Sequence, residues 1–313
     1  MIDTLVFSSG GVGGISFIGC LKALEECGEL ENVRTMVGVS AGSMFACLIA
    51  LQYTSDKIIQ IVKDIDFNLL FHFDFDKLVN IDEELGLDKG DKLQSVIDLI
   101  IKHKTGSEHT TFEDLFEKTS INLVIGAVCI NTKKMVFFSY ENNPGMEIRT
   151  AIRMSCSIPV LFSPIKWEGK LYIDGGMLSR YPIQIPPVDQ SQCGLGFFVR
   201  SKSDESVISE EESNFMTYLK QIMTLMYESS QKFENPNPNI HTVELSTPLD
   251  GYAPLTISNE EKDKIIAIGF SKTKEKIIEL RLNHYNKIIT AHKKIEECIK
   301  RKRVLGARFI RNL

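Results

Sequence analysis

The first 53 residues contain the same pattern twice: an apolar strand, a glycine-containing turn and an apolar helix. The stretch "DTLVFS" (residues 3–8) precedes a glycine loop and a helical spacing of apolar residues over 15–26, which ends at Gly28. The stretch "VRTMVGV" leads through "GVSAG" (38–42) into "SMFACLIALQY", which is apolar on every side. Two such units in succession are typical of a mainly parallel sheet covered by helices, so we expect an α/β fold.

The first glycine loop, "SSGGVGG" (8–14), is suited to holding an anion, and three kinds of anion compete for it. The dinucleotide fingerprint Gly-x-Gly-x-x-Gly fails because Ser16 occupies the place of its third glycine. The P-loop pattern fails because Cys20 stands where that loop requires lysine. The remaining candidate is the oxyanion of an acyl-transfer reaction.

The second turn matches the Gly-x-Ser-x-Gly nucleophile elbow, with Ser40 between Gly38 and Gly42. Such a turn holds a serine hydroxyl above the sheet at a helix N-terminus, and its flanking positions tolerate only small side chains. A serine nucleophile needs an oxyanion hole, which the backbone N–H groups of Gly10 and Gly11 can supply. The context of strand, turn and helix favours a catalytic serine over a chance match.

The serine also needs a base, and Asp174 is the best-placed candidate. It ends the predicted strand "KLYID" and is followed by Gly175 and Gly176, so its carboxylate is expected at the carboxyl edge of the sheet. The alternative interpretation is a plain Asp-Gly turn. None of the six histidines ends a predicted strand beside loop-forming residues: His72, His103, His109, His241, His284 and His292.

Five segments in order resemble the patatin-like phospholipase family over roughly residues 3–190. They are the glycine loop with "FIGCLKALEE", then "VGVSAGSMFA", "GLDKGDKL", "AIRMSCSIPVLFSP" and "LYIDGGMLSRYP". The resemblance implies a three-layer α/β/α fold with a mainly parallel central sheet. It also implies a Ser–Asp dyad without histidine: Ser40 as nucleophile, Asp174 as general base, and Gly10 and Gly11 in the oxyanion hole.

The same resemblance implies the activity of a lipid acyl hydrolase of phospholipase A type, with an acyl-Ser40 intermediate and no metal or other cofactor. A carboxylate in a largely apolar cleft becomes more basic than in water, so it can activate a serine directly. The family's loop reads Gly-Gly-Gly-x-Arg/Lys-Gly, whereas here Ser9 replaces the first glycine and Gly13 replaces the basic residue. A cation there would attract a phosphate headgroup, so neutral glycerides and simple esters remain open as substrates beside phospholipids.

The chain is expected to divide into a catalytic domain, residues 1–200, and a second region, residues 201–313. The second region begins with the acidic, serine-rich loop "SKSDESVISEEES" and continues into a helical C-terminal part that packs on or extends the domain. Residues 272–313 carry thirteen Lys and Arg against four Asp and Glu, a net charge of +9. The preceding residues carry 23 against 37, a net charge of −14.

The basic tail has apolar residues at helical spacing, Ile278, Leu282, Tyr285 and Ile289. A basic amphipathic helix can dock on an anionic membrane, but such a helix can equally pack on the domain or bind a partner. The Phe-rich run "FNLLFHFDFDKLV" (67–79) is either a lid or core between helices. Nucleic-acid binding is not expected, because the rest of the chain is acidic and contains no known module.

Cysteine usage and the chain start favour an intracellular protein. Seven scattered cysteines, with no Cys-x-x-Cys pair and no histidine at ligand spacing, indicate reduced thiols and no metal site. The N-terminus lacks the features of a signal peptide, and no apolar run is long enough to span a bilayer. We therefore expect a cytoplasmic protein, either free or peripheral to membranes.

Two other functions remain open on the sequence alone. The first is an α/β-hydrolase esterase with His241 as the triad histidine, since the chain order Ser, Asp, His permits it. The second is a catalytically silent lipid-binding or scaffolding protein whose basic tail is its working part. All the groups needed for the chemistry are present, which favours an enzyme.

Overall fold

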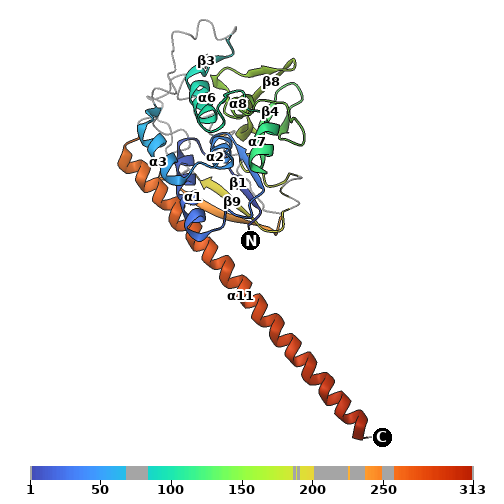
Figure 1. Cartoon of the computed structure of the whole chain (residues 1–313). Coiled ribbons are helices and arrows are strands. Elements are labelled where there is room, and N and C mark those ends of the chain that lie inside the picture. The colour runs from blue at the N-terminus through green and yellow to red at the C-terminus, as the bar shows by residue number, and fades with distance from the viewer. Residues whose placement is uncertain are drawn as a thin grey trace.

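The computed structural model describes most of the chain: residues 2–67, 84–185, 188, 191–200, 225, 237–248 and 257–311, with side chains up to residue 295. At its centre lies an eight-stranded sheet (Figure 1). The parallel part of this sheet has the order β10-β9-β1-β2-β4. Its strands are β1 (Thr4–Phe7), β2 (Thr35–Val39), β4 (Asn122–Cys129), β9 (Gly194–Arg200) and β10 (Ile240–Ser246).

Antiparallel strands complete the sheet beyond β4. Both β5 (Lys134–Phe138) and β8 (Lys170–Asp174) pair with β4, and β7 (Ile165–Trp167) pairs with β8. A separate two-stranded sheet joins β3 (Gly86–Asp88) to β6 (Val160–Phe162). The hairpin of β7 and β8 turns at Glu168 and Gly169, both with positive φ.

Helices of the described chain follow the strands and flank the sheet. They are η1 (Gly11–Ile15), α1 (Ser16–Cys27), α2 (Ala41–Ala50), α3 (Ser55–Asp64), α6 (Asp91–Thr105), α7 (Phe112–Thr119), α8 (Ile148–Ser155), η3 (Gly175–Met177) and α11 (Asn259–Arg311). The α1 helix ends at Gly28 in a left-handed conformation, where its apolar spacing stops. The mainly parallel sheet with flanking helices and a C-terminal helix confirms the expected α/β class.

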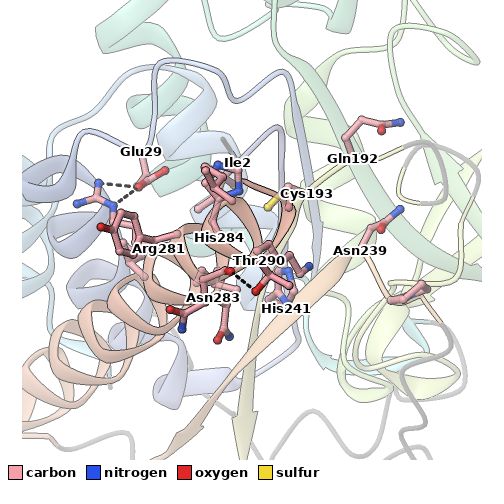
Figure 2. Close-up of a pocket in the computed structure, with 18 of the residues that line it drawn as sticks. Ile2, Glu29, Gln192, Cys193, Asn239, His241, Arg281, Asn283, His284 and Thr290 are labelled. Atoms are coloured by element: carbon pink, nitrogen blue, oxygen red, sulfur yellow. Dashed lines mark hydrogen bonds and ion pairs between the residues drawn. The ribbon is translucent and has the colours of Figure 1, made fainter. Parts of the chain in front are cut away.

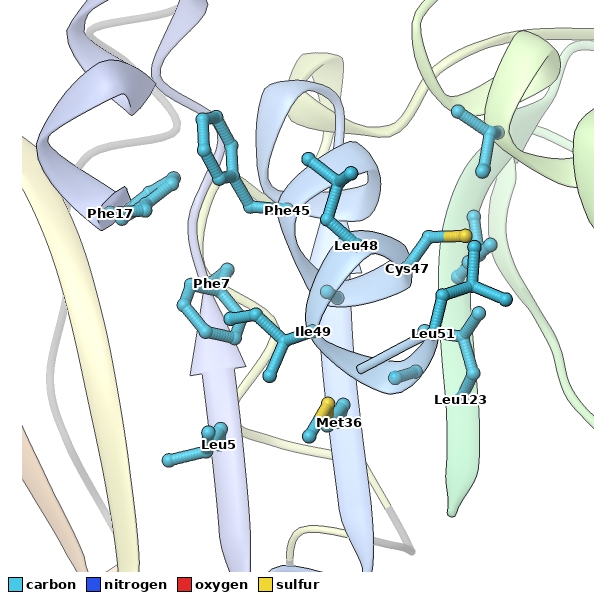
Figure 3. Close-up of a cluster of buried hydrophobic side chains, with 14 of the residues drawn as sticks. Leu5, Phe7, Phe17, Met36, Phe45, Cys47, Leu48, Ile49, Leu51 and Leu123 are labelled. Carbon is cyan, nitrogen blue, oxygen red and sulfur yellow. The ribbon is translucent and has the colours of Figure 1, made fainter. Parts of the chain in front are cut away.

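The larger of the two core clusters includes the layer between the sheet and α2. Alternate residues of β1, Leu5 and Phe7, face the same side as Met36 of β2 and pack against Phe45 and Ile49 of α2 (Figure 3). These side chains are at least nine-tenths buried. Because α2 lies in this apolar layer, its helix is apolar on nearly every side, as the sequence shows.

The other face of the sheet has its own apolar cluster. Val6 and Val37, which alternate with the residues of the first face, pack there with Tyr181, Ile183 and Ile185. The segment that follows β8 and η3 therefore covers the second face. Because only η3 and a few residues separate Asp174 from Tyr181, the packing of this segment helps to hold the end of β8 in place.

The α11 helix packs against α1 at very short range. A Cβ atom added at Gly269 would lie 1.9 Å from the backbone oxygen of Ser16, and one at Gly19 would lie 1.9 Å from that of Ile266. Only glycine permits this approach. Figure 1 shows α11 leaving the α1 region and extending far beyond the rest of the molecule.

Several elements differ from the sequence-based expectation. β3, β9 and β10 have no counterpart among the elements expected from the sequence. β10 belongs to the central sheet, so this part of the region after residue 200 extends the domain, while the boundary itself stays a prediction. The Phe-rich run beyond Phe67 and the acidic loop of residues 201–213 lie outside the described residues.

No helix within the described ranges is both long and apolar enough to cross a bilayer.

Candidate active site

Ser40 sits in a sharply strained turn between β2 and α2. Its backbone has φ of 55° and ψ of −129°, a conformation that few residues other than glycine adopt. A Cβ atom at Gly38 would lie 2.3 Å from the backbone oxygen of Gly42, and one at Gly42 would lie 2.4 Å from that of Ser8. The two glycines of the motif are therefore required by close backbone contact, and the turn has the geometry of a nucleophile elbow.

Hydrogen bonds from neighbouring elements hold this turn. The Ser40 N–H donates to Ser155 Oγ over 2.8 Å, and Ser155 Oγ donates to the backbone oxygen of Gly126 on β4 over 2.6 Å. The Ser43 hydroxyl donates to the Ser40 backbone oxygen over 2.6 Å. These bonds fix the backbone of Ser40 and leave its hydroxyl for another partner.

That partner is positioned by β4, which β2 and β8 share as a neighbour. β2 runs parallel to β4 and ends with Val39 opposite Gly126. β8 runs antiparallel to β4 and ends with Asp174 opposite Ala127, the next residue along. Because β5 pairs with one edge of β4, both β2 and β8 must pair with its other edge. β2 pairs with the first part of that edge, up to Gly126, and β8 pairs with the part that follows. The ends of β2 and β8 thus meet, and Ser40 follows directly on one of them.

The two side chains form a direct hydrogen bond. Ser40 Oγ donates to Asp174 Oδ2 over 2.6 Å, and the Gly176 N–H donates to Asp174 Oδ1 over 2.7 Å. Ser40 is 8% exposed and Asp174 is 2% exposed. Burial raises the pKa of Asp174 to about 7, although the hydrogen bonds from Ser40 and Gly176 act to lower it. A carboxyl with this pKa near neutrality can exchange a proton with the serine.

The first glycine loop lies beside the dyad. A Cβ atom at Gly176 would lie 3.1 Å from the Ser9 side chain, and one at Gly14 would lie 3.2 Å from Cβ of Ala41. Gly10 and Gly11 therefore lie on a loop whose two ends flank Asp174 and Ser40. Gly11 begins η1, where the first N–H groups of a helix have no acceptor within it.

A buried arginine, Arg180, supports this loop and was not singled out from the sequence. Its Nε donates to Ser9 Oγ over 3.3 Å, its Nη2 donates to the Val199 backbone oxygen over 3.1 Å, and its own backbone oxygen accepts from the Ser9 N–H over 2.7 Å. Arg180 is 1% exposed, and its guanidinium lies over the ring of Phe198. The only sequence signal is a basic residue six positions after Asp174.

Gly13, which replaces the basic residue expected in the loop, is closely packed. A Cβ atom there would lie 3.0 Å from Val199 Cγ1 and 3.1 Å from Thr247 Oγ1. A longer side chain would have to displace these neighbours. The nearby positive charge belongs instead to Arg180, which contacts both Ser9 of the loop and Val199 of β9.

The alternative base, His241, is far from Ser40. It lies in β10, three strands from β2 in the sheet, and the parallel registers place it level with Met36 near the amino edge. Three strand spacings amount to about 14 Å. Burial lowers the pKa of His241, and Lys276 and Lys287 contribute to the shift. The triad that uses His241 is therefore wrong, because the fold holds this histidine away from the serine.

His241 faces a hollow of about 1210 Å³ at the amino edge of the sheet (Figure 2). The hollow lies between α11, which contributes His284 and Lys287, and the chain leading into β1 and β10. The dyad lies at the carboxyl edge, so the two sites are at opposite ends of the strands.

Among the described residues, no three His, Cys, Asp or Glu side chains are grouped closely enough to hold a metal ion.

Comparison with known proteins identifies the family. Residues 5–186 match the model of the patatin-like phospholipase family. The chain belongs to this family. Family membership supports a lipid hydrolase function, and it confirms the resemblance inferred from the five sequence segments.

Relatives and solved structures agree with this assignment. Protein R571 of Acanthamoeba polyphaga mimivirus is 29% identical to this patatin-like chain over 290 residues, which cover 90% of the chain and 96% of R571. "Probable lipid hydrolase 463L" of Invertebrate iridescent virus 6 is 33% identical over 184 residues, covering 58% of the chain and 62% of that protein. The crystal structure of VipD from Legionella pneumophila has a similar fold, with a TM-score of 0.63, 16% identity, and coverage of 88% of this chain and 66% of VipD. The chain thus spans less than two thirds of the last two proteins.

Proposed function

We propose that this patatin-like chain is a phospholipase A-type acyl hydrolase that uses Ser40 as nucleophile and Asp174 as general base. The observation that carries the proposal is the 2.6 Å hydrogen bond between Ser40 Oγ and a buried carboxylate with a raised pKa. Direct contact makes an intervening histidine unnecessary. The sequence of relative 463L, named a probable lipid hydrolase, supports the same class of substrate.

The chemistry proceeds in two steps. In the first, Asp174 takes the hydroxyl proton of Ser40 as Oγ attacks the ester carbonyl, and the protonated carboxyl then returns that proton to the leaving alcohol. The product is an acyl-Ser40 ester. In the second, Asp174 takes a proton from water, the resulting hydroxide attacks the acyl carbon, and Ser40 recovers its proton as the fatty acid leaves.

The negative charge on the carbonyl oxygen needs donors at the dyad. The N–H groups of Gly10 and Gly11 are the best candidates, because their loop flanks both catalytic side chains. The Ser40 N–H is unsuitable because Ser155 already accepts it. The N-terminus of α2, beginning at Ala41, adds a favourable helix dipole at the same place.

The class of ester is set by what surrounds the dyad. Phospholipids and neutral glycerides both present the required carbonyl, and the loop lacks the basic side chain that would select a phosphate. Arg180 contacts the loop but is buried, so its guanidinium does not offer a site for a phosphate headgroup from solvent. We therefore extend the proposal to acyl-ester lipids in general, with phospholipids included.

The test is release of fatty acid from mixed phospholipid vesicles and from triglyceride emulsions by the parent chain, Ser40→Ala and Asp174→Asn. We expect only the parent to release fatty acid, with losses of at least about 1,000-fold in the two variants. Labelling by a fluorophosphonate probe should require Ser40. Thr290→Ala, which changes a hydroxyl on exposed α11, serves as the matched control and should keep full activity.

Equal, negligible release by all proteins in both assays, with no labelling, would leave the scaffold hypothesis in place and end the enzyme proposal. Release that survives in Ser40→Ala would assign the activity to another nucleophile. The better of the two lipid preparations would identify the substrate class.

A further inference from the structure

The last turn of α8 and the two residues after it (residues 153–157, the α8 turn) bind the backbones of both proposed catalytic residues. The Ser40 N–H donates to Ser155 Oγ over 2.8 Å, and the Asp174 N–H donates to the Ser157 backbone oxygen over 2.8 Å. Both of these acceptors belong to fully buried serines. Any movement of the α8 turn therefore changes the geometry of the hydrogen bond between Ser40 and Asp174.

A buried arginine in the same turn, Arg153, ties it to another part of the chain. Its Nη1 donates to Ser157 Oγ over 2.7 Å, and that hydroxyl donates back to the Arg153 backbone oxygen over 2.7 Å. Its Nη2 donates to the Lys89 backbone oxygen over 2.7 Å. Lys89 directly follows β3, so the guanidinium joins the connection between β3 and α6 to the α8 turn.

The guanidinium of Arg153 is closely enclosed. Its Cζ lies 5.0 Å from the centre of the Phe162 ring, and a Cβ atom added at Gly90 would lie 2.0 Å from Nη2. Gly90 is the N-cap of α6, which lies beside α8 (Figure 1). Arg153 is 2% exposed. These neighbours leave the fork of the side chain little room to move.

Core packing alone does not account for an arginine at this position. Among the described residues, its hydrogen-bond acceptors are a hydroxyl and a backbone oxygen, and neither is a carboxylate. Burial lowers the pKa of Arg153, although Asp88 and Asp91 act to raise it. An apolar side chain of similar size would avoid the cost of burying this charge. A planar fork that bonds two segments at once is what arginine adds here.

We propose that Arg153 is a positioning residue for the dyad of Ser40 and Asp174, an inference that rests on the proposed function. By bonding Lys89 and Ser157 together, the guanidinium fixes the α8 turn, and Ser157 in turn fixes the backbone of Asp174. A misplacement of about 1 Å at a catalytic group can cost about 100-fold in rate. The dyad therefore depends on the contact between β3 and α8 as well as on the registers of β2 and β8.

The first experiment replaces the fork and keeps its charge. Arg153→Lys cannot reach both acceptors in the same way, so on a soluble ester we expect kcat to fall by about tenfold with KM unchanged. Labelling of Ser40 by a fluorophosphonate should slow by a similar factor and still reach the same final extent, which shows that the variant is folded. A change in melting temperature alone, with kcat and the labelling rate unchanged, would overturn the proposal.

Two glycines of α6 provide a matched pair of variants. Gly90 and Gly106 cap the two ends of this helix, and both have left-handed backbones, with φ of 76° and 88°. Alanine is strained at either position, but nothing lies within 4 Å of its Cβ atom at Gly106, whereas at Gly90 it meets Arg153. Gly90→Ala should lower kcat by about tenfold, and Gly106→Ala should lower only the melting temperature. Equal kcat in the two variants would overturn the role of the guanidinium contact.

A double variant tests the route through Ser157. Ser157→Ala removes the hydroxyl that accepts from Arg153 and keeps the backbone oxygen that accepts from Asp174. It should lower kcat about as much as Arg153→Lys. The two changes together should cost no more than either one alone, because they break the same link. Losses that multiply in the double variant would show that Arg153 does not act through Ser157.

Hydrogen exchange tests the same link without any measurement of activity. The Asp174 N–H is protected by its bond to Ser157, so this amide, followed in a peptide covering residues 170–176, should exchange at least about tenfold faster in Arg153→Lys. A peptide covering β9 serves as the control and should not change. If the parent hydrolyses no ester and is not labelled, the proposed function fails, and the exchange result alone then judges whether Arg153 holds Asp174. Unchanged exchange in the variant would overturn the proposal whatever the kinetics.

Discussion

At the scale of single residues, the protonation of Asp174 controls when the proposed nucleophile can be activated. Only the carboxylate form can accept the Ser40 proton, and burial raises the pKa of Asp174 to about 7. The base is therefore present in a minority of molecules below this pH and in most molecules above it. The same burial makes the pair sensitive to any change that admits water.

The expected pH profile follows from the raised pKa of Asp174. kcat/KM should rise by about tenfold between pH 6 and pH 8 and then level off, because deprotonation creates the active form. The measurement is initial-rate kinetics on a soluble ester, which avoids changes in a lipid surface with pH. A profile that is flat over this range, or that falls, would contradict Asp174 as the base.

Arg180 is a residue that only the structure brings to the glycine loop. Its fork-shaped guanidinium contacts Ser9 and β9 at once, and we expect it to position the glycine loop. Arg180→Lys should lower kcat by about tenfold with little change in KM, because the loop acts mainly on the transition state.

Arg200→Lys is the matched control for this prediction. Arg200 also lies over the ring of Phe198, but it is exposed and pairs with Glu244 at the end of β9. Its replacement should leave both kinetic constants unchanged. If Arg180→Lys changes only the melting temperature, the arginine has a structural role alone.

At the scale of elements, the elbow depends on close contact between β2, α2 and the end of β1. Gly38→Ala would place a methyl group 2.3 Å from the Gly42 backbone oxygen, where no flexible side chain can give way. We expect a loss of at least about 3 kcal/mol in the free energy of unfolding, together with loss of activity.

Gly145→Ala provides the comparison, since nothing lies within 4 Å of its added Cβ atom. It should stay within about 0.5 kcal/mol of the parent in a denaturant titration. Equal stability of the two variants would show that the elbow can relax, and that the packing around Gly38 is less rigid than the structure indicates.

At the scale of the whole molecule, the first part of α11 belongs to the catalytic domain. Lys262 is 4% exposed and donates to the backbone oxygens of Val62 and Ile65 at the end of α3. Ile265 and Ile277 lie in the main core. The close contact with α1 then fixes the direction in which the rest of the helix extends.

Two truncations separate these parts of α11. A chain that ends after residue 295 should melt within about 3 °C of the full chain, because it keeps Lys262, Ile265 and Ile277, which hold α11 on the domain. A chain that ends after residue 258 should fail to give a cooperative transition, because it exposes the apolar face of α1. Cooperative unfolding of the shorter chain in calorimetry would show that α11 is a separate unit.

The sequence alone predicted the α/β class and the glycine turn at Ser40, because hydrophobic period, turn glycines and motif spacing are local properties. It also put forward Asp174 as the base, a role that stays a prediction. It did not reveal β9 or β10, whose pairing depends on β1 far away in the chain. The meeting of Ser40 and Asp174 was decided only by the registers of β2 and β8 on β4. The same registers exclude His241 as the base of a triad. Hydrogen bonds between strands that are distant in the chain, and not chain order, determine which side chains lie at the same edge of the sheet.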